Sequence, residues 1–292
     1  MASIRMEVQY STIEIFQSVL EYTHKGTNKQ IRLDDNSLSS EVSKSKFYQD
    51  GTSISRHYLA EKQPHPIIQV VDGDCINHAL KLKSEGYNPI VLNMANAVIP
   101  GGAYLDGAGG QEENLFRRTN LFQYLEQKKN ECYPIPSYGG IYCPNSTVIR
   151  ASEQENYEFL ENPEKLSFVT VAAICQPQLV LGENGEYTLN EHDKETTRRK
   201  IRTMLNIGLD NGHDTIVLSA FGCGAFSNPP STMARLFYEI ISKEYFGEKE
   251  NLPKTYKNIS FAIFDDEGAR QWKNNEGNFI PFKKVFANGI SS

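Results

Sequence analysis

Two adjacent glutamates, Glu112 and Glu113, are the residues of this 292-residue chain whose types and spacing best suit chemistry. They follow a glycine-rich stretch, PGGAYLDGAGG. Glycine lets the backbone approach a ligand closely and adopt positive φ, and two carboxylates beside such a loop could hold sugar hydroxyls and protonate a leaving oxygen. A simpler explanation exists, because acidic residues in the first turn of a helix stabilise it through its dipole. On the pattern alone, we favour that simpler explanation.

A second glycine turn occurs at residues 222–226, where the sequence is GCGAF. It follows an apolar strand expected at residues 215–221 and precedes a helix expected to begin near Ser231. Backbone N–H groups in such a turn, together with a helix dipole, can bind phosphate. A Gly-x-Gly turn alone is weak evidence for this function. Cys223 could act as a nucleophile with His213 as its base, but nothing in the sequence pairs the two residues, so we discount that interpretation.

The elements that must position these turns alternate between strands and helices. Strands are expected at residues 67–71, 90–94, 168–174, 215–221 and 259–264, and helices at 74–85, 111–122, 194–211 and 233–245. This alternation predicts the α/β class in a three-layer α/β/α arrangement. Ligands of such sheets bind beyond the carboxyl ends of the strands. Both glycine turns follow strands, so we expect them to meet at one cleft.

The stretch around the glutamates resembles the defining motif of the bacterial-type poly(ADP-ribose) glycohydrolases, which are macrodomains. The likeness is carried by Asn93, Asn96 and the run PGGAYLDGAGGQEENLFRR, with its glycines, spacer and Gln-Glu-Glu. GCGAF is similar to the second motif of that family. The chain departs from the motif at Ala103, which stands where the family has its third glycine. The added methyl group could narrow the site.

The resemblance implies a macrodomain-like three-layer α/β/α sandwich with a mixed sheet, plus an N-terminal helical extension. It implies that Glu113 is the acid that protonates the leaving ribose oxygen and then activates water, and that Glu112 holds ribose hydroxyls. It requires no metal and no cofactor. The residues expected to bind ADP-ribose are Asp74, Asn96, Gly101, Gly102, Ala103, Gln111, Gly222, Cys223, Gly224, Ala225 and Phe226.

Several of these residues have a structural alternative that the sequence leaves open. Asp74 could cap the following helix or accept a hydrogen bond from the adenine amino group. Asn96 could bond only loop backbone, although we favour the ribose contact that the resemblance implies. Either Arg117 or Arg118 could face pyrophosphate, and for at least one of them we favour a solvated helix face. We expect Phe226 to pack against the terminal ribose.

The flanking segments give weaker patterns. A helix is expected at residues 11–23, with Ser11 and Glu14 as a capping box, followed by an irregular polar arm to residue 55 with one short strand at 30–33. We divide the chain into an extension, residues 1–60, packed on a catalytic domain, residues 61–292. The other expectations are a surface insertion at 153–165, a loop at 181–193, a solvated basic helix face at 198–202, and a C-terminal tail with Trp272 and a short helix at 279–286.

Composition restricts the function classes further. The net charge of −6 argues against a sequence-specific nucleic-acid binder. Five cysteines without C-x-x-C spacing indicate neither a zinc site nor a disulfide framework. The chain shows no signal peptide and no membrane-spanning run. We therefore expect an intracellular protein, cytoplasmic or nuclear, that does not bind membranes.

The leading hypothesis is a poly(ADP-ribose) glycohydrolase that hydrolyses the ribose–ribose O-glycosidic bond, with exo action as in the family. Its substrate would be poly(ADP-ribose) or an ADP-ribosylated protein, and its product ADP-ribose. Three alternatives stay open. They are a mono-ADP-ribosyl hydrolase, a module that binds ADP-ribose without cleaving it, and a nucleotide-binding α/β protein with no link to ADP-ribose. Ala103 favours the binding module, whereas two retained glutamates count against it.

Overall fold

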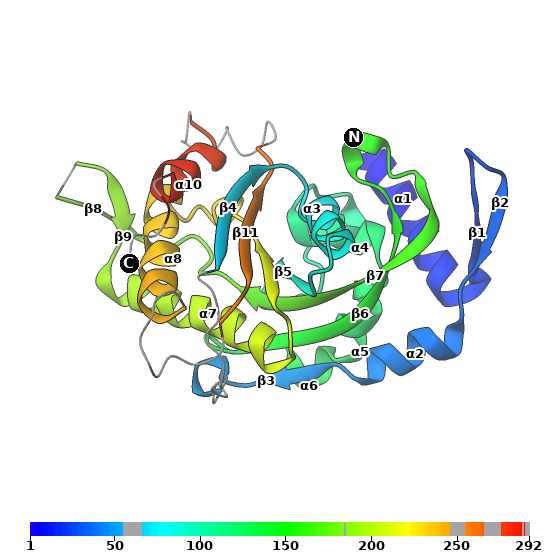
Figure 1. Cartoon of the computed structure of the whole chain (residues 1–292), viewed down its shortest axis with the longest axis horizontal. Helices are drawn as coiled ribbons and strands as arrows, with labels where there is room; N and C mark the ends of the chain where they lie inside the picture. The colour runs from blue at the N-terminus through cyan, green and yellow to red at the C-terminus, as the bar shows by residue number, and fades with distance from the viewer. Residues whose placement is uncertain (55–65, 184, 246–254, 266–275, 288, 290–292) are drawn as a thin grey trace.

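A seven-stranded mixed sheet forms the centre of the protein in the computed structural model, which describes residues 1–54, 66–183, 185–245, 255–265, 276–287 and 289 (Figure 1). The strand order is β3-β6-β7-β5-β10-β11-β4. The strands from β7 to β4 are parallel, whereas β6 and β3 run antiparallel to their neighbours. The bounds are β3 (Lys46–Tyr48), β4 (Ile67–Asp72), β5 (Pro89–Ala95), β6 (Gly140–Arg150), β7 (Phe159–Ala172), β10 (Thr215–Leu218) and β11 (Asn258–Ile263).

Helices cover both faces of this sheet. One face carries α7 (Glu191–Asp210), α8 (Pro230–Glu244) and α10 (Phe279–Phe286), and the other carries α3 (Cys75–Ser84), α4 (Gln111–Arg118) and α5 (Leu121–Gln127) (Figure 1). Along β5, Ile90 and Leu92 belong to the first core and Val91 to the second. A parallel strand covered on both faces reads as a continuous apolar run, which is why β5 was visible in the sequence. The predicted three-layer α/β/α architecture is confirmed.

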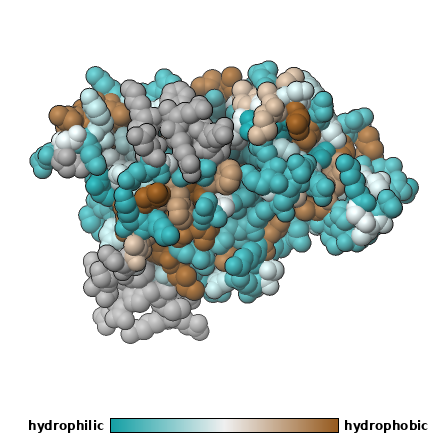
Figure 2. Space-filling view, turned by 90° about the horizontal axis from the view of Figure 1, so that it is seen from above, coloured by the Kyte–Doolittle hydropathy of each residue, from teal (hydrophilic) through white to brown (hydrophobic). Residues whose placement is uncertain are grey.

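Most apolar side chains lie within these two cores. The face in Figure 2 is accordingly hydrophilic over most of its described area, with separate hydrophobic patches. No helix in the described part of the chain is long and apolar enough to cross a membrane.

Most of the expected core elements are confirmed to within a few residues. The single helix expected at 111–122 was wrong, because the backbone of Thr119 is extended, with a φ of −139°, and separates α4 from α5. Asp74 caps α3 by accepting a hydrogen bond from the Asn77 N–H at 2.8 Å, and Asn190 caps α7 through the Asp193 N–H at 2.9 Å. Such caps satisfy N–H groups that have no partner inside the helix. The expected helix of the tail is α10, while Trp272 lies outside the described residues.

The predicted position of the first helix was wrong. Helix α1 spans Ala2–Glu14 and continues as one π-helical segment, η1 (Ile15–Val19). Ser11 lies inside α1, so the capping box with Glu14 does not form. The inner face of α1 includes two buried polar residues, Gln9 and Thr12, so its hydrophobic period in the sequence is weak.

The arm from residue 24 to 55 is more ordered than we predicted. The expected short strand is β2 (Lys29–Arg32), which pairs with β1 (Glu21–His24). Helix α2 (Asp35–Ser43) and strand β3 follow, then the 3₁₀ turn η2 (Gly51–Ser53). Strand β3 is a three-residue edge strand of the main sheet, too short to be recognised from the sequence. The boundary predicted at residue 60 lies outside the described residues.

The segment at residues 153–165, which we predicted to be a surface insertion, lies mostly at the surface and has regular secondary structure. It contains the 3₁₀ turn η4 (Glu153–Glu155) and the first half of β7, which pairs with β6 in a long hairpin. This half of β7 is polar because it extends beyond the two cores. The loop predicted at 181–193 contains a second hairpin, β8 (Leu179–Leu181) with β9 (Tyr187–Leu189). Short elements η3 (Tyr104–Asp106) and α6 (Lys129–Cys132) complete the described structure.

Candidate active site

Both glycine turns lie at the carboxyl edge of the sheet, where β4, β5, β10 and β11 end. The first turn, residues 101–110, connects β5 to α4, and the second, residues 222–228, connects β10 to α8. Glu112 and Glu113 occupy the first turn of α4, after the N-cap residue Gly110. The structure therefore places both predicted motifs at the edge of the sheet where ligands of open α/β proteins bind.

Glu112 is almost completely enclosed, with 3% of its surface exposed. One carboxylate oxygen accepts a hydrogen bond from the Asn93 side-chain amide at 3.2 Å, and the other accepts one from the Asn96 N–H at 2.8 Å. Burial disfavours the charged form and raises the pKa of Glu112 to about 8, against the opposing effect of these two donors; the nearby Glu113 raises it further. At neutral pH this carboxyl therefore favours its protonated form.

Glu113 is half-buried, and the first glycine turn surrounds its carboxylate. The Ala103 N–H donates to Oε1 at 3.3 Å. A Cβ atom on Gly102 would lie 2.6 Å from the same oxygen, and one on Gly110 would overlap Oε2. Gly102 also has a φ of +55°, which side chains of L residues rarely adopt. Glycine at these two positions makes room for the Glu113 carboxylate.

Ala103 differs from the two glycines before it. Gly101 and Gly102 have φ values of +74° and +55°, whereas the φ of Ala103 is −100°. Its side chain is exposed. The backbone of this turn therefore does not require glycine at the third position.

Gln111 holds α4 to the end of β5. Its side-chain amide accepts a hydrogen bond from the Met94 N–H at 2.9 Å and donates one to the Leu92 carbonyl at 2.7 Å. Strand β10 pairs with β5 only as far as Val91, so Gln111 satisfies backbone groups beyond that point. The predicted contact of Gln111 with ADP-ribose stays a prediction, and the structure gives its amide a positioning role.

Asn96 performs the loop-bonding role that was its structural alternative. Its side-chain oxygen accepts hydrogen bonds from the N–H groups of Val98 at 2.8 Å and Ile99 at 3.1 Å. A ribose contact would therefore come from its amide nitrogen, and it stays a prediction.

The second turn is held by Asn228, a residue that sequence reasoning missed. Its side-chain amide nitrogen contacts the carbonyl oxygens of Ile174, Gly222 and Phe226 at 2.7, 3.0 and 3.3 Å. Its position, six residues after Gly222 in the same loop, was the one feature of the sequence that could have indicated this role. The N–H groups of Gly224, Ala225 and Phe226 have no acceptor within the described part of the chain, and they are therefore the donors available to an anion.

Cys223 and His213 lie at opposite ends of β10, so they form no nucleophile–base pair. Cys223 is buried, and burial raises the pKa of its thiol. His213 contacts the Tyr142 hydroxyl at 3.1 Å and the Asn88 carbonyl at 3.1 Å. Discounting the cysteine nucleophile is therefore confirmed. Phe226 is half-buried against the core beneath α7 and α8.

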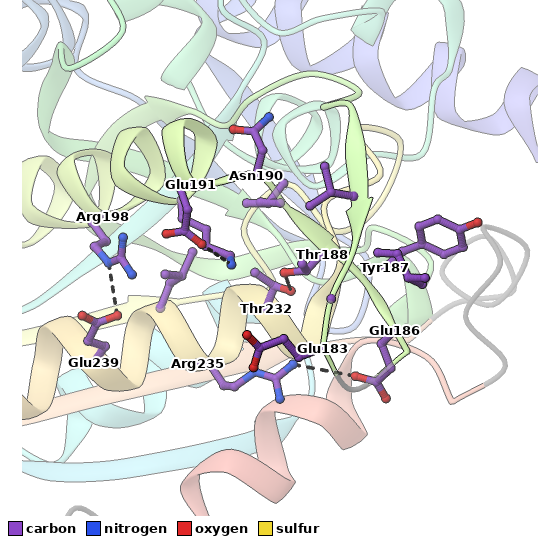
Figure 3. Close-up of a pocket in the computed structure, with 16 residues that line it drawn as sticks. Glu183, Glu186, Tyr187, Thr188, Asn190, Glu191, Arg198, Thr232, Arg235 and Glu239 are labelled. Carbon is purple, nitrogen blue, oxygen red and sulfur yellow. Dashed lines mark hydrogen bonds and ion pairs between the residues drawn. The ribbon is translucent and has the colours of Figure 1, made fainter.

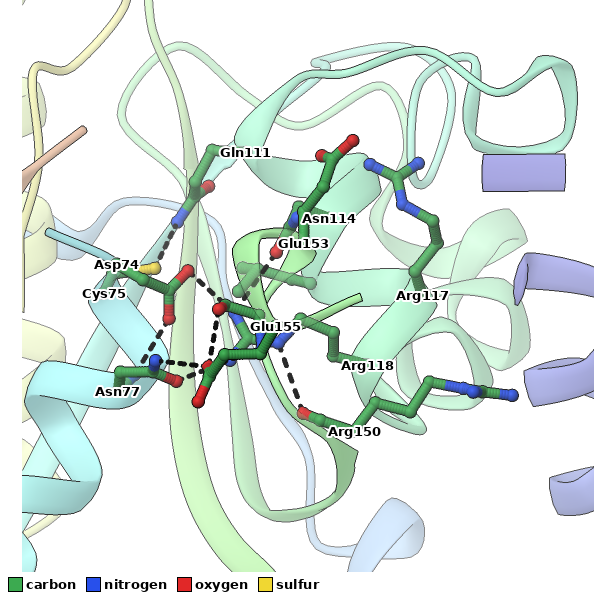
Figure 4. A network of polar contacts seen from close by, with 12 residues as sticks. Asp74, Cys75, Asn77, Gln111, Asn114, Arg117, Arg118, Arg150, Glu153 and Glu155 are labelled. Carbon is green, nitrogen blue, oxygen red and sulfur yellow. Dashed lines mark hydrogen bonds and ion pairs between the residues drawn. The ribbon is translucent and has the colours of Figure 1, made fainter. Parts of the chain in front are cut away.

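The solvated helix face predicted for at least one of Arg117 and Arg118 was wrong, because both side chains are fully buried. Arg118 pairs with Asp74 at 2.7 Å and donates to Asn77 at 2.9 Å (Figure 4). Asp74 thus uses one carboxylate oxygen as a helix cap and the other in an ion pair. Its predicted role in adenine recognition is untested. Polar groups contributed by α3 and the β6–β7 hairpin compensate the burial of these arginines, which periodicity alone cannot indicate.

Residues 10–151 match the family model of the microbial-type PARG catalytic domain, where PARG denotes poly(ADP-ribose) glycohydrolase. This part of the chain is therefore similar to that family. The match includes Asn93, Asn96 and the Gln-Glu-Glu motif, and it ends before the second glycine turn. No curated protein sequence matches the chain.

Solved structures of bacterial PARGs share the fold. The Thermomonospora curvata enzyme matches with a TM-score of 0.75 at 22% identity, over 97% of this chain and 99% of that one. Its complex with the inhibitor ADP-HPD gives a TM-score of 0.72. The Deinococcus radiodurans enzyme in complex with ADP-ribose matches with a TM-score of 0.67 at 20% identity, over 88% of this chain and 99% of that one. The macrodomain-like fold is thus common to this chain and those enzymes.

A cavity of about 700 Å³ lies away from the PARG motif, between the β8–β9 hairpin, α7 and α8 (Figure 3). Its charged lining is largely internally paired, as in the contact of Arg198 with Glu239 at 3.1 Å and of Lys194 with Glu191 at 2.7 Å. Neither Glu112 nor Glu113 lines it. The candidate active site is therefore the region of the glycine turns, which has the two carboxyl groups and the backbone N–H groups that lack an acceptor among the described residues.

The prediction that the basic run on α7 forms a solvated helix face was wrong. Arg198 and Arg202 pair with glutamates of α8, Glu239 and Glu244. The Arg199 guanidinium lies over the Tyr138 ring. Lys200 is buried and donates to the Ser137 carbonyl at 2.6 Å. These side chains join α7 to α8 and to the segment before β6.

Proposed function

We propose that this protein is a poly(ADP-ribose) glycohydrolase that releases ADP-ribose from the end of the polymer. One observation carries the proposal. At the start of α4, a half-buried Glu113 enclosed by glycines stands beside a buried Glu112 whose pKa is raised to about 8. Two carboxyl groups in unlike environments suit glycoside hydrolysis, which needs one group to donate a proton and another to orient the sugar.

The two carboxyl groups take different roles because their surroundings differ. Both oxygens of Glu112 accept hydrogen bonds from the end of β5, so this side chain is held rigidly. We assign it to the ribose hydroxyls, which fixes the sugar position. Glu113 is the more accessible carboxyl, and among the described residues it accepts a hydrogen bond only from the Ala103 N–H. We assign it as the acid that protonates the leaving ribose oxygen and then takes a proton from the attacking water.

The second turn supplies the pyrophosphate contacts in this proposal. The N–H groups without an acceptor among the described residues lie just before the N-terminus of α8. These N–H groups and the dipole of the helix both favour binding of a negatively charged group. Phe226 would pack against the terminal ribose, and Asp74 would reach the adenine amino group beside its ion pair with Arg118. No metal or cofactor has a part in this scheme. An intracellular location stays a prediction.

The test is release of ADP-ribose from automodified poly(ADP-ribosyl)ated protein by wild type and Glu113→Gln. We expect the variant to lose activity by a factor on the order of 10²–10⁴, the usual contribution of a general acid, while ADP-ribose binding measured by calorimetry is kept. Glu191→Gln is the matched control, because Glu191 also lies in the first turn of a helix and is paired with Lys194. It should retain full activity.

The other outcomes distinguish the alternatives. Binding of ADP-ribose without release from polymer would contradict the glycohydrolase, and release from mono-ADP-ribosylated protein would then identify a mono-ADP-ribosyl hydrolase. Binding without release from either substrate would identify a binding module. Failure to bind ADP-ribose would leave a nucleotide-binding protein of another kind.

A further inference from the structure

Arg117, in the last turn of α4, is fully buried, yet no carboxylate within the described part of the chain forms an ion pair with it. Its Nε donates to the Tyr157 hydroxyl at 2.9 Å and its Nη1 donates to the Ala108 carbonyl at 2.8 Å. Its Nη2 is buried without an acceptor among the described residues. Burying such a charge is costly, which points to a role for its directed hydrogen bonds. Figure 4 shows this guanidinium directed away from Arg118.

The Ala108 contact connects Arg117 to the proposed acid through three successive hydrogen bonds. Arg117 Nη1 donates to the Ala108 carbonyl. The Ala108 N–H donates to the Ala103 carbonyl at 3.4 Å, and the Ala103 N–H donates to Glu113 at 3.3 Å. The two intermediate residues, Ala108 and Ala103, both belong to the first glycine turn. A displacement of Ala108 would therefore be transmitted to the group that holds the Glu113 carboxylate.

The other side of Arg117 is fixed by α1 and the β6–β7 hairpin. Tyr157, which accepts from Arg117, donates to Glu153 at 3.0 Å, and Glu153 pairs with Arg5 at 2.9 Å. Thr12 also donates to the backbone carbonyl of Arg117 at 2.7 Å. The N-terminal helix thus contacts both the side chain network and the main chain of Arg117.

We propose that Arg117 is a positioning residue that holds the glycine turn so that Glu113 is correctly placed for proton transfer, with α1 as its support. The inference rests on the proposed function for its catalytic meaning. Arg117 does not touch the substrate, because its side chain is fully enclosed. Its loss should therefore lower kcat and leave the affinity for ADP-ribose nearly unchanged.

The test uses Arg117→Lys and Arg117→Met in the full chain. Lysine keeps a donor but cannot reach both acceptors with one planar group, and methionine removes every donor. We expect kcat for ADP-ribose release to fall about 10-fold with lysine and about 100-fold with methionine, as for small misplacements of a reacting group. The Kd of ADP-ribose should change by less than about threefold, since that affinity arises from contacts Arg117 does not make.

Lys200→Met is the matched control. Lys200 is also a buried cation that donates to a backbone carbonyl, that of Ser137 at 2.6 Å, but it lies on α7 and donates to no residue of α1 or of the first glycine turn. We expect this variant to melt at a lower temperature while keeping kcat, when all assays are run well below the melting temperature of the least stable variant. Hydrogen exchange at the Ala103 and Ala108 amides should accelerate in Arg117→Met and not in Lys200→Met.

The inference is overturned if Arg117→Met keeps wild-type kcat, if Lys200→Met loses kcat to the same extent, or if the two turn amides exchange as in wild type. If wild type releases no ADP-ribose, the proposed function fails instead. The exchange comparison then decides by itself whether Arg117 holds the turn.

Discussion

The two glycine turns at the carboxyl edge of the sheet are built on opposite plans. The first, residues 101–110, closes around a side chain, the carboxylate of Glu113, and two of its glycines, Gly102 and Gly110, leave the space that this group occupies. The second, residues 222–228, is held from behind by Asn228 and leaves backbone N–H groups available. Glycine thus helps to enclose a carboxyl in one turn and to present backbone donors to an anion in the other.

The comparison predicts that an added methyl group affects kcat in the first turn and binding in the second. In Gly110→Ala the methyl would overlap Glu113 Oε2, and the φ of −64° accepts alanine. The carboxylate must move while the fold is kept, so we expect kcat to fall about 100-fold. In Gly224→Ala nothing in the described structure lies within 4 Å of the new methyl. We expect an unchanged melting temperature and an ADP-ribose Kd raised about 10-fold, because the methyl occupies ligand space.

Steady-state kinetics, calorimetry with ADP-ribose and thermal melting of both variants separate these effects. Loss of kcat in Gly224→Ala with unchanged Kd would break the comparison. So would a Gly110→Ala variant with wild-type kcat, since Glu113 would then not depend on the space that glycine leaves.

A second prediction concerns the carboxyl group of Glu112, which follows the first glycine turn and has no counterpart beside the second. The pKa of Glu112 rises from an ordinary value of 4.5 to about 8 on burial, so between these pH values the folded state binds one proton more than the unfolded state. Stability from this group is complete below pH 4.5 and decreases as pH rises toward 8. Glu112→Gln removes the dependence, and its free energy of unfolding relative to wild type should rise by on the order of 2 kcal/mol between pH 5 and 7.

Urea unfolding of both proteins across this pH range measures the difference. Glu191→Gln provides a control that should stay flat between pH 5 and 7. The hydrogen bond with Lys194 lowers the pKa of Glu191 from 4.5, so this carboxyl is ionised in both the folded and the unfolded protein over that range and its contribution changes only at lower pH. A Glu112→Gln difference that stays flat with pH would show that the two donors from Asn93 and Asn96 outweigh the burial of the carboxyl.

The difference between local signals and distant partners explains which features could be predicted from the sequence. Glycines, the glutamate pair and the apolar strands are local signals, so the turns, the fold class and the placement of Glu112 and Glu113 could be predicted. The surroundings of Arg117 and Arg118 could not, because their partners lie far away in the chain. Thr12 meets the Arg117 carbonyl across 105 positions, and Asp74 meets Arg118 across 44. Periodicity places charged residues on the surface unless such partners are known.

The predicted position of the N-terminal helix was wrong for a related reason. Gln9 and Thr12 are buried because they donate to the last carbonyls of α4, those of Phe116 and Arg117. A helix whose inner face is polar lacks the apolar stripe that a sequence pattern detects. The polar half of β7 escaped detection in the same way, because its pairing with β6, and not apolar alternation, determines that it is a strand.

The smallest effect is expected for Ala103→Gly, which restores the third glycine of the family motif. The φ of Ala103 is −100° and its side chain is exposed, and its N–H contact with Glu113 needs no side chain. We therefore expect kcat and the ADP-ribose Kd to change by less than about twofold, with stability lower by at most about 1 kcal/mol because glycine has more freedom in the unfolded chain. Gly102→Ala is the contrasting variant, since its φ of +55° and its contact with Glu113 exclude a methyl group. A tenfold gain in kcat/KM for Ala103→Gly would mean that the methyl group narrows the site, and the enclosure of Glu113 would then depend on three small residues in the first turn instead of two.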